Sequence, residues 1–121
     1  MLKPQNLFII FIFQIQLFAS IPVTVTSYCS NKHECSGNPF VTATGYHLTK
    51  KDKKVVVAVS RNLFKKFKNK KIKLKIGKTI HYVTVRDTMH PRWHNKVDIY
   101  YSTDIKGALK FGKRKGIISE I

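Results

Sequence analysis

Strict alternation of apolar and charged residues is the feature that most constrains the fold of this chain. Lys71-Ile72-Lys73-Leu74-Lys75-Ile76 puts isoleucine and leucine on one face and lysine on the other, which is the period of a half-buried strand. Gly77-Lys78 and the β-branched, aromatic run 79–86 come next. The pattern predicts a β-hairpin with one face in a core.

Further strands are predicted where β-branched residues recur between turn signals. Residues 23–28 alternate, and residues 55–59 are apolar throughout, as in a strand buried on both faces. Residues 97–101 and 116–121 complete the set. Because nearly every strand adjoins a turn signal, we expect a mainly β fold, a compact barrel of about six strands rather than a sandwich.

Two short helices are predicted beside the strands. Residues 61–68 follow Ser60, which can cap a helix, and Leu63, Phe64 and Phe67 fall on one face. The second helix has Ser102 or Thr103 as its cap and Gly112 at its end. Its expected inward face consists of Ile105, Ala108 and Leu109.

The N-terminal segment has the order of a secretory signal. Lys3 precedes an apolar run that begins at Leu7 and continues, broken by glutamines, to Ala19. Cleavage is expected after Ala19 or Ser20, which gives a signal over 1–20 and one domain over 21–121. The alternative is an uncleaved N-terminal anchor. After cleavage we expect no stable membrane span and a secreted, periplasmic or cell-envelope location.

The chain is strongly basic. It has 23 lysines and arginines against six acids, a formal net charge of +17. Removal of residues 1–19 deletes only Lys3, so the charge becomes 17 − 1 = +16. An exported cation of this kind adheres to anionic polymers such as wall glycan, lipid headgroups or nucleic acid. Export and the absence of a recognition motif argue against a specific nucleic-acid partner.

Cys29 and Cys35 are the only cysteines in the sequence. In an exported protein they can form a local disulfide, which would stabilise the fold by about 2 kcal/mol. The alternative is a metal site made of Cys29, His33, Cys35 and His47, but its spacing fits no standard zinc pattern. We therefore expect a disulfide and no metal.

Two acids flank one loop in this basic chain. Asp87 ends the predicted strand 80–86, Asp98 begins the next, and Trp93 lies between them with His90 and His94. Asp98 falls inside an apolar strand pattern, where an acid without a role is costly. Asp87 can instead bond the amides of its own loop. The histidines are expected at the loop surface.

Several segments together resemble the three-aspartate (3D) domain. They are Ala58-Val59-Ser60-Arg61-Asn62-Leu63, Val85-Arg86-Asp87-Thr88-Met89, Asn95-Lys96-Val97-Asp98-Ile99, the turn Phe40-Val41-Thr42-Ala43-Thr44-Gly45 and Ala108-Leu109-Lys110-Phe111-Gly112-Lys113. This domain belongs to the rare-lipoprotein-A-like superfamily, with expansins and the catalytic barrel of membrane-bound lytic transglycosylase A. The resemblance spans residues 23–121 and implies a six-stranded double-psi β-barrel with two short helices.

The sequence departs from the family pattern at two places. Ser60 stands where the family usually carries its first aspartate, just after an alanine-valine pair. The loop Asp87-Thr88-Met89-His90 lacks the two glycines of the family's aspartate-threonine-glycine-glycine loop.

The resemblance implies a glycan-binding groove with Asp98 as its acid and Asp87 as its partner. In lytic transglycosylases of the superfamily the matching aspartate protonates the glycosidic oxygen and then deprotonates the muramoyl 6-hydroxyl. A single carboxyl group can serve both steps. The expected sugar contacts are Thr24, Thr26, Thr88, Trp93 and Tyr100. Trp93 can stack on a sugar or merely cover the barrel end. No cofactor and no metal are implied.

Three functions follow as hypotheses. The first is an exported peptidoglycan-active enzyme of lytic-transglycosylase type, and whether the chain is an enzyme is left open. The second is a non-catalytic, expansin-like glycan-binding or wall-loosening module, which the missing glycines and the basic charge favour. The third is a cationic toxin or polyanion binder that has kept only the barrel. The expected partner is peptidoglycan or another anionic wall polymer, bound by a monomer.

Overall fold

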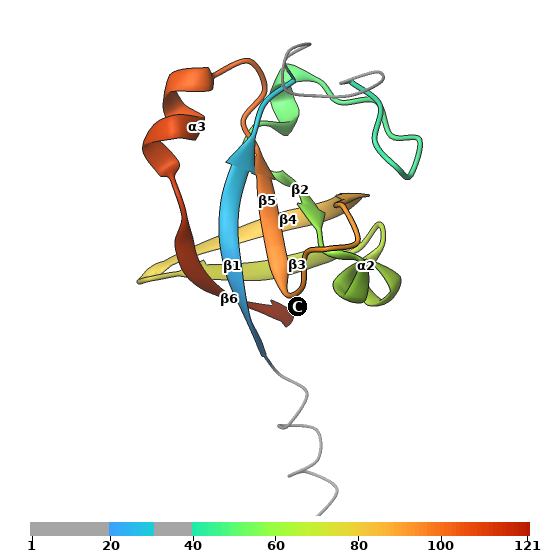
Figure 1. Ribbon diagram of the computed structural model, residues 1–121, viewed down its shortest axis with the longest axis vertical. Helices are drawn as coiled ribbons and strands as arrows, with labels where there is room; N and C mark the ends of the chain where they lie inside the picture. Colours follow the sequence, from blue (N-terminus) through green and yellow to red (C-terminus); the bar gives the residue numbers. More distant parts are fainter. Residues whose placement is uncertain (1–19, 31–39) are drawn as a thin grey trace, which may run out of the picture.

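The computed structural model describes residues 20–30 and 40–121, in which six strands close into a barrel (Figure 1). The strands follow one another around the barrel in the order β1-β5-β2-β4-β3-β6. They are β1 (Ile21–Tyr28), β2 (Val56–Val59), β3 (Lys71–Ile76), β4 (Thr79–Thr88), β5 (Lys96–Tyr100) and β6 (Arg114–Glu120). The predicted fold class, a mainly β barrel of six strands with two helices, is confirmed.

The pairing mixes parallel and antiparallel neighbours. β1 runs parallel to β5, and β2 runs parallel to β4, whereas the other pairs are antiparallel. The predicted hairpin is β3 and β4, paired from Lys71↔Thr84 to Ile76↔Thr79. Gly77 makes its turn with φ +58°, a left-handed conformation that glycine adopts without strain.

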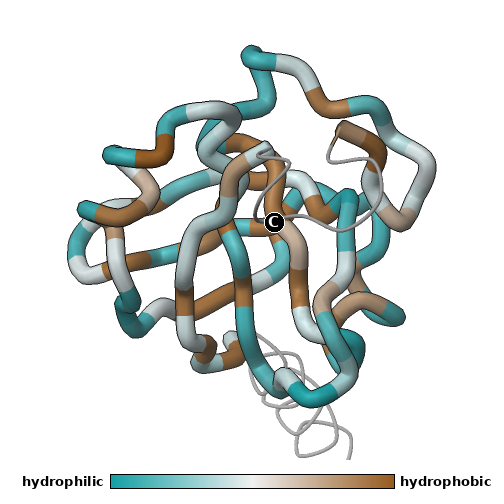
Figure 2. Tube along the Cα trace, turned by 45° about the horizontal axis from the view of Figure 1, so that its top comes forward, coloured by the Kyte–Doolittle hydropathy of each residue, from teal (hydrophilic) through white to brown (hydrophobic). Residues whose placement is uncertain are grey.

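Alternate side chains of every strand fill the barrel. Val25, Val57, Val85, Val97, Leu74 and Ile118 are all fully buried. Figure 2 shows the resulting alternation of hydrophobic and hydrophilic residues along the strands. The interior is therefore packed with side chains, and any site that faces solvent must lie on the outer wall or at the barrel ends.

β2 is buried on both faces, as its apolar sequence predicts. Val57 and Val59 point into the main core, while Val56 packs outside the barrel with Leu48 and Tyr100. The segment that contains the 3₁₀ turn η1 (Lys50–Asp52) supplies Leu48 to this second cluster.

Helix α2 (Arg61–Phe67) begins where the sequence predicts and buries Leu63 and Phe67, with Phe64 half-buried. Ser60 occupies the N-cap position, but its side chain makes no capping hydrogen bond. Its hydroxyl donates to Asn62 Oδ1 and accepts from the Lys96 amide. The serine thus ties the helix start to β5.

Helix α3 (Ile105–Phe111) differs from its prediction in two respects. Its cap is Asp104, whose Oδ1 accepts from the Gly107 amide, rather than Ser102 or Thr103. Leu109 is 76% exposed and Ile105 41% exposed, so the prediction is wrong for these two of the three residues expected to face inward. Ala108, the third, packs against the core as predicted, together with Phe111. Gly112 ends the helix at φ +66° as predicted.

The predicted signal and the predicted disulfide involve residues that the structure does not describe. Residues 1–19, His33 and Cys35 lie outside the described residues. Cys29 is buried, and its thiol contacts the Asp104 carbonyl at 3.6 Å. Within 20–30 and 40–121, no helix has the length and apolar character to cross a membrane.

Candidate functional site

Asp98 projects from the outer wall of the barrel. Its neighbours on β5, Val97 and Ile99, point into the core. Because side chains alternate along a strand, Asp98 faces outward. Its register partner on β1 is Thr26, whose hydroxyl donates to Asp98 Oδ1 at 3.0 Å. The parallel pairing of β1 and β5 therefore supplies this carboxyl group with a hydroxyl donor.

A β-bulge brings Asp87 to the same wall. β2 and β4 pair as Val57↔Val85 and then as Ala58↔Asp87, so Arg86 is the extra residue. Val85 is fully buried, and strict alternation would turn Asp87 inward as well. A bulge re-aims the side chains that follow it. Here it places Asp87 beside Ala58 on the outer face.

Ala58 joins the two acids. It pairs with Asp98 on β5 and with Asp87 on β4, so Thr26, Asp98, Ala58 and Asp87 form one row across four strands, hereafter the acid row. Two strand spacings separate the backbones of the acids by about 10 Å. The register therefore places both acids on one wall of the barrel.

The environment of Asp98 favours its protonated form. Burial raises the pKa of Asp98 from its ordinary value to about 6. The Thr26 hydrogen bond and the Lys96 charge lower that pKa, and the Asp87 charge raises it, but burial prevails. A carboxyl group with this pKa exchanges protons near neutral pH, as a general acid and base must.

Asp87 also holds the backbone in place. Its Oδ1 accepts from the Ala43 amide and from the Thr88 amide, both at 2.9 Å. The bond to its own loop was the structural alternative for this residue, and the structure shows it. The bond to Ala43 in addition anchors the 40–46 turn against β4. Burial raises the pKa of Asp87, and the two amides lower it.

The other described acids have structural partners elsewhere. Asp52 accepts from the Tyr46 hydroxyl and from the Thr49 amide. Asp104 caps α3 and pairs with Lys53 at 2.8 Å, and Glu120 lies 4.0 Å from Lys66. Among the described acids, Asp87 and Asp98 are the two that share an outward-facing row.

Thr24 and Trp93 extend this surface on one side of the acid row. Thr24 pairs with Lys96 two residues along β1 and β5, and therefore on the same face as Thr26 and Asp98. Lys96 Nζ lies 3.7 Å from the centroid of the Trp93 ring, and the Arg92 guanidinium lies 4.9 Å from it. Trp93 is 38% exposed. Cations thus contact its ring, and a sugar that stacked on Trp93 would have to displace them or use the part of the ring that they leave exposed.

Thr88 and Tyr100, the other expected sugar contacts, are less accessible to a ligand. Thr88 is half-buried and donates its hydroxyl to the Val59 carbonyl at 3.1 Å. Tyr100 is 1% exposed, packs with Leu48 and Val56, and bonds Ser30 through its hydroxyl at 2.6 Å. Tyr100 does not lie where a sugar could contact it, because the 40–50 segment covers that part of the wall.

Ala58 is the site residue that the sequence analysis missed. It is the smallest side chain in the apolar run Val56–Val59, and the structure places it between the two carboxylates. An alanine among valines on a predicted central strand was the available signal.

The acid row lies on the outer wall of the barrel. Clefts of about 370, 280 and 360 Å³ lie elsewhere, and neither acid is among their lining residues. The cleft of 280 Å³ adjoins the row, since Val56, Thr84 and Arg86 line it. In the described part of the chain no group of three or more histidine, cysteine or acidic side chains could hold a metal ion.

Comparison with known proteins identifies the fold. No protein-family model matches this sequence, and no curated protein matches it. The structure is similar to the crystal structure of an expansin from Clavibacter michiganensis in its apo form, with a TM-score of 0.59 and 15% sequence identity. The alignment covers 84% of this chain and 50% of the expansin, so the chain spans half the length of that protein. At this identity the likeness establishes that the chain has the barrel fold found in that expansin.

Proposed function

We propose that this protein acts on cell-wall glycan, cleaving peptidoglycan strands with Asp98 as acid and then as base. The observation that carries the proposal is the pairing of an outward, half-buried Asp98 with a pKa of about 6 and a second carboxylate, Asp87, across Ala58. The structural likeness to an expansin supports a polysaccharide as the ligand class.

The proposed chemistry needs one carboxyl group. Protonated Asp98 gives its proton to the glycosidic oxygen as the bond from that oxygen to the anomeric carbon breaks. The 6-hydroxyl of the same muramoyl residue attacks the anomeric carbon, and its proton returns to Asp98. The product is a 1,6-anhydro sugar and no water is consumed, so no second catalytic carboxylate is required. Thr26 orients the Asp98 carboxyl group through its hydrogen bond.

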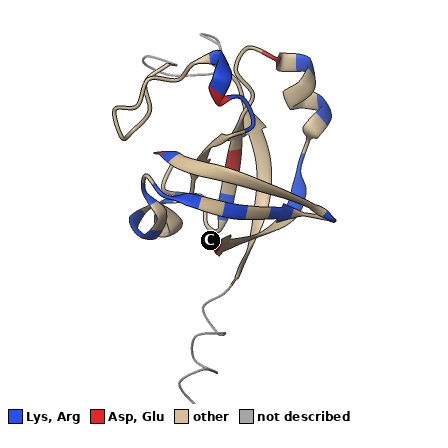
Figure 3. Ribbon diagram, turned by 180° about the vertical axis from the view of Figure 1, so that it is seen from behind, with Lys and Arg blue, Asp and Glu red and all other residues tan. Residues whose placement is uncertain are grey.

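The charge distribution suits a wall polymer. Lysines and arginines are spread over the helices and several strands, and acidic residues are few (Figure 3). A cationic surface raises the local concentration of an anionic polymer without selecting a sequence or a sugar. Export to the envelope, which the predicted signal over 1–20 supports, is part of this proposal.

The decisive experiment is digestion of purified sacculi by the domain of residues 21–121, followed by mass spectrometry of the released fragments. Wild-type protein is expected to release anhydromuropeptides, and Asp98→Asn is expected to release none. Glu120→Gln is the control for charge, because it also removes one carboxylate, but an exposed one that lies outside the acid row. Release by Asp98→Asn at the wild-type rate would refute the enzymatic proposal.

The second candidate is a non-catalytic, expansin-like glycan-binding module. The likeness to the expansin structure favours it. It predicts that wild-type protein binds sacculi but releases no fragments, and that Asp98→Asn binds equally well. Binding carried by lysines should weaken steeply with salt.

A further inference from the structure

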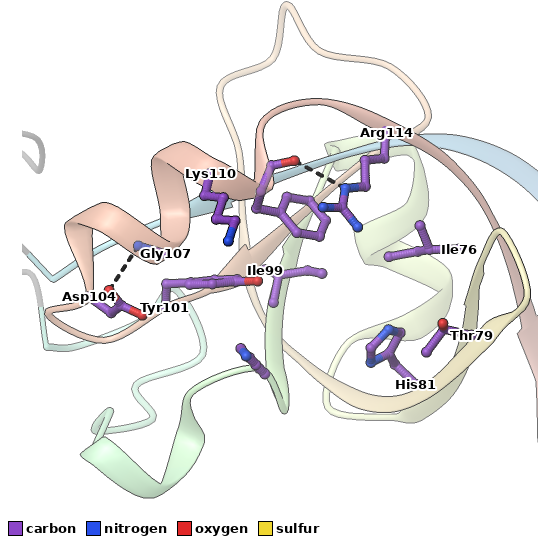
Figure 4. A pocket seen from close by; sticks show the side chains of 11 residues that line it. Ile76, Thr79, His81, Ile99, Tyr101, Asp104, Gly107, Lys110 and Arg114 are labelled. Carbon is purple, nitrogen blue, oxygen red and sulfur yellow. Dashed lines mark hydrogen bonds between the residues drawn. The ribbon is translucent and has the colours of Figure 1, made fainter.

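A cleft at one end of the barrel lies apart from the acid row. It has a volume of about 370 Å³ and opens between α3, the turn of the β3–β4 hairpin and the start of β6. Figure 4 shows side chains from these elements around one space. We refer to it as the end cleft.

The floor of the end cleft is apolar. Ile76 and Ile99 belong to the barrel core, and both line the cleft. Tyr101 and Phe111 form its aromatic wall, with ring centroids 5.8 Å apart at 52°. Tyr101 is only 8% exposed. These surfaces can bury an apolar group about the size of one ring.

Three cations surround that floor, each from a different part of the chain. Lys54 precedes β2, Lys110 lies on α3, and Arg114 begins β6. Lys54 Nζ lies 5.5 Å from the centroid of the Tyr101 ring. In Figure 4 the Lys110 amine points toward the Tyr101 ring, and the Arg114 guanidinium lies beside the Phe111 ring. Like charges brought together by folding repel one another, which a bound anion would relieve.

Arg114 is held in position for a ligand. Its Nε donates to the Phe111 carbonyl at 3.1 Å, and its guanidinium lies 4.5 Å from the centroid of the Phe111 ring. The bond uses Nε and leaves the two terminal amino groups directed at the cleft (Figure 4). A guanidinium fixed in this way is suited to a planar carboxylate or to phosphate oxygens.

The one acid that lines the end cleft does not cancel this charge. Asp104 pairs with Lys53 at 2.8 Å and accepts from the Gly107 amide. Lys53 compensates its charge, and Lys54, Lys110 and Arg114 remain. The cleft therefore combines a net positive rim with an apolar floor.

We propose that the end cleft is a second binding site, for a small ligand that bears a carboxylate or phosphate group on an apolar, ring-sized body. The anionic group would lie between Lys110 and Arg114, and the apolar body would rest on Tyr101, Phe111 and Ile99. The volume of about 370 Å³ is at the lower end of the range of small-molecule sites, which suits one ring-sized body with its anionic group. This site is independent of the acid row and of any glycan cleavage there.

The test is calorimetric titration of the protein with four probes: phenyl phosphate, benzoate, inorganic phosphate and benzyl alcohol. Phenyl phosphate, benzoate or both should bind about tenfold or more tightly than inorganic phosphate or benzyl alcohol. Phenyl phosphate and benzoate each carry an anionic group and an aromatic ring, whereas the other two probes carry only one of these. The preference between phenyl phosphate and benzoate assigns the anionic group. If neither phenyl phosphate nor benzoate binds more tightly than inorganic phosphate and benzyl alcohol, the proposal is overturned, since the cleft would then not combine its cations with its floor.

Two triple variants distinguish binding at the end cleft from general attraction to the cationic surface. Lys54→Gln/Lys110→Gln/Arg114→Gln should weaken phenyl phosphate binding by about tenfold or more. Lys71→Gln/Lys73→Gln/Lys75→Gln removes the same charge from residues of β3 that do not line the cleft, and should change affinity by less than about twofold. An equal loss in both variants would show general attraction to a cation and overturn the site. If the first triple variant fails to fold, Lys110→Gln alone, on the exposed side of α3, should weaken binding by about threefold, and an unchanged affinity would overturn the proposal.

Discussion

Ala58 lies directly opposite Asp98 in the antiparallel pairing of β2 with β5, and the same alanine lies opposite Asp87 across the parallel pairing with β4. A methyl group thus separates two carboxylates in a protein with few acids. The two acids are eleven positions apart in the sequence, and their proximity depends on a third strand that comes before both of them.

Ala58→Leu should abolish glycan binding or cleavage at the acid row. The larger side chain would fill the space between the carboxylates, and because Ala58 is only 4% exposed it would also crowd its neighbours. Overpacking of this kind costs about 1 to 3 kcal/mol. Sacculus digestion and urea unfolding would measure the two effects. Ala58→Ser, which adds little volume, is the control, and full activity in Ala58→Leu would show that the row is not the binding surface.

Thr26→Val should raise the pKa of Asp98 above about 6. The Thr26 hydroxyl stabilises the ionised carboxylate, so its loss favours the protonated form. A titration of the Asp98 carboxyl carbon by NMR measures the change directly. Any cleavage activity should move its pH profile upward in parallel. Thr26→Ser keeps the hydroxyl and should restore the wild-type titration; an unchanged pKa in Thr26→Val would contradict the assigned hydrogen bond.

Stability should fall as pH rises from about 4 to about 6, through the Asp98 titration. In this window the folded protein retains a proton on Asp98 that the unfolded chain has released, since the folded pKa is about 6 against an ordinary 3.8. Above the window the ionised, half-buried carboxylate costs about 2 to 3 kcal/mol. Asp98→Asn removes this cost because the amide does not ionise, and its Oδ1 can still accept the hydrogen bond from Thr26.

Urea unfolding of wild type and Asp98→Asn at a series of pH values tests this dependence. The variant should be the more stable protein at pH 7, and the difference should shrink toward pH 4. The difference in unfolding free energy between the two proteins cancels the contributions of the titratable groups that both contain. One of these is Asp104, whose pKa is lowered by Lys53 and whose titration therefore makes stability rise with pH. A constant difference across the series would show that the pKa of Asp98 is not raised.

Asp87→Ala should loosen the 40–46 turn. The Asp87 carboxylate accepts from two backbone amides, and losing both bonds should destabilise the fold by about 1 to 3 kcal/mol. Hydrogen exchange at the Ala43 and Thr88 amides should accelerate. Asp87→Asn keeps Oδ1, the oxygen that accepts both bonds, and should retain stability while losing the charge. If Asp87→Asn also keeps full activity on sacculi, Asp87 has only its structural role.

The barrel could be predicted from sequence because its signals are local. The alternation of Lys71–Ile76, the apolar run of β2 and the turn at Gly77 each reflect side chains that must face a core or solvent within one segment. The helices were located by the same reasoning. The inward face of α3 was predicted only at Ala108, because the packing of the helix against the barrel, which buries Phe111 in part and leaves Ile105 and Leu109 exposed, is a tertiary property.

The candidate site required tertiary structure for most of its geometry. The sequence singled out Asp87 and Asp98 by their rarity, but the bulge that turns Asp87 outward arises from the pairing of β2 with β4. The burial of Tyr100 depends on the covering segment that carries Leu48, far away in the sequence. The role of Ala58 depends on two neighbours that come later in the chain.

The sequence by itself therefore determined that this chain forms a small, cationic β-barrel, because the period of its apolar residues dictates which faces are buried. Only the tertiary structure decided which polar side chains share a face of that barrel. Strand order and register are properties of pairings between distant segments, and a shift of a single residue in one strand moves its side chains to the opposite face.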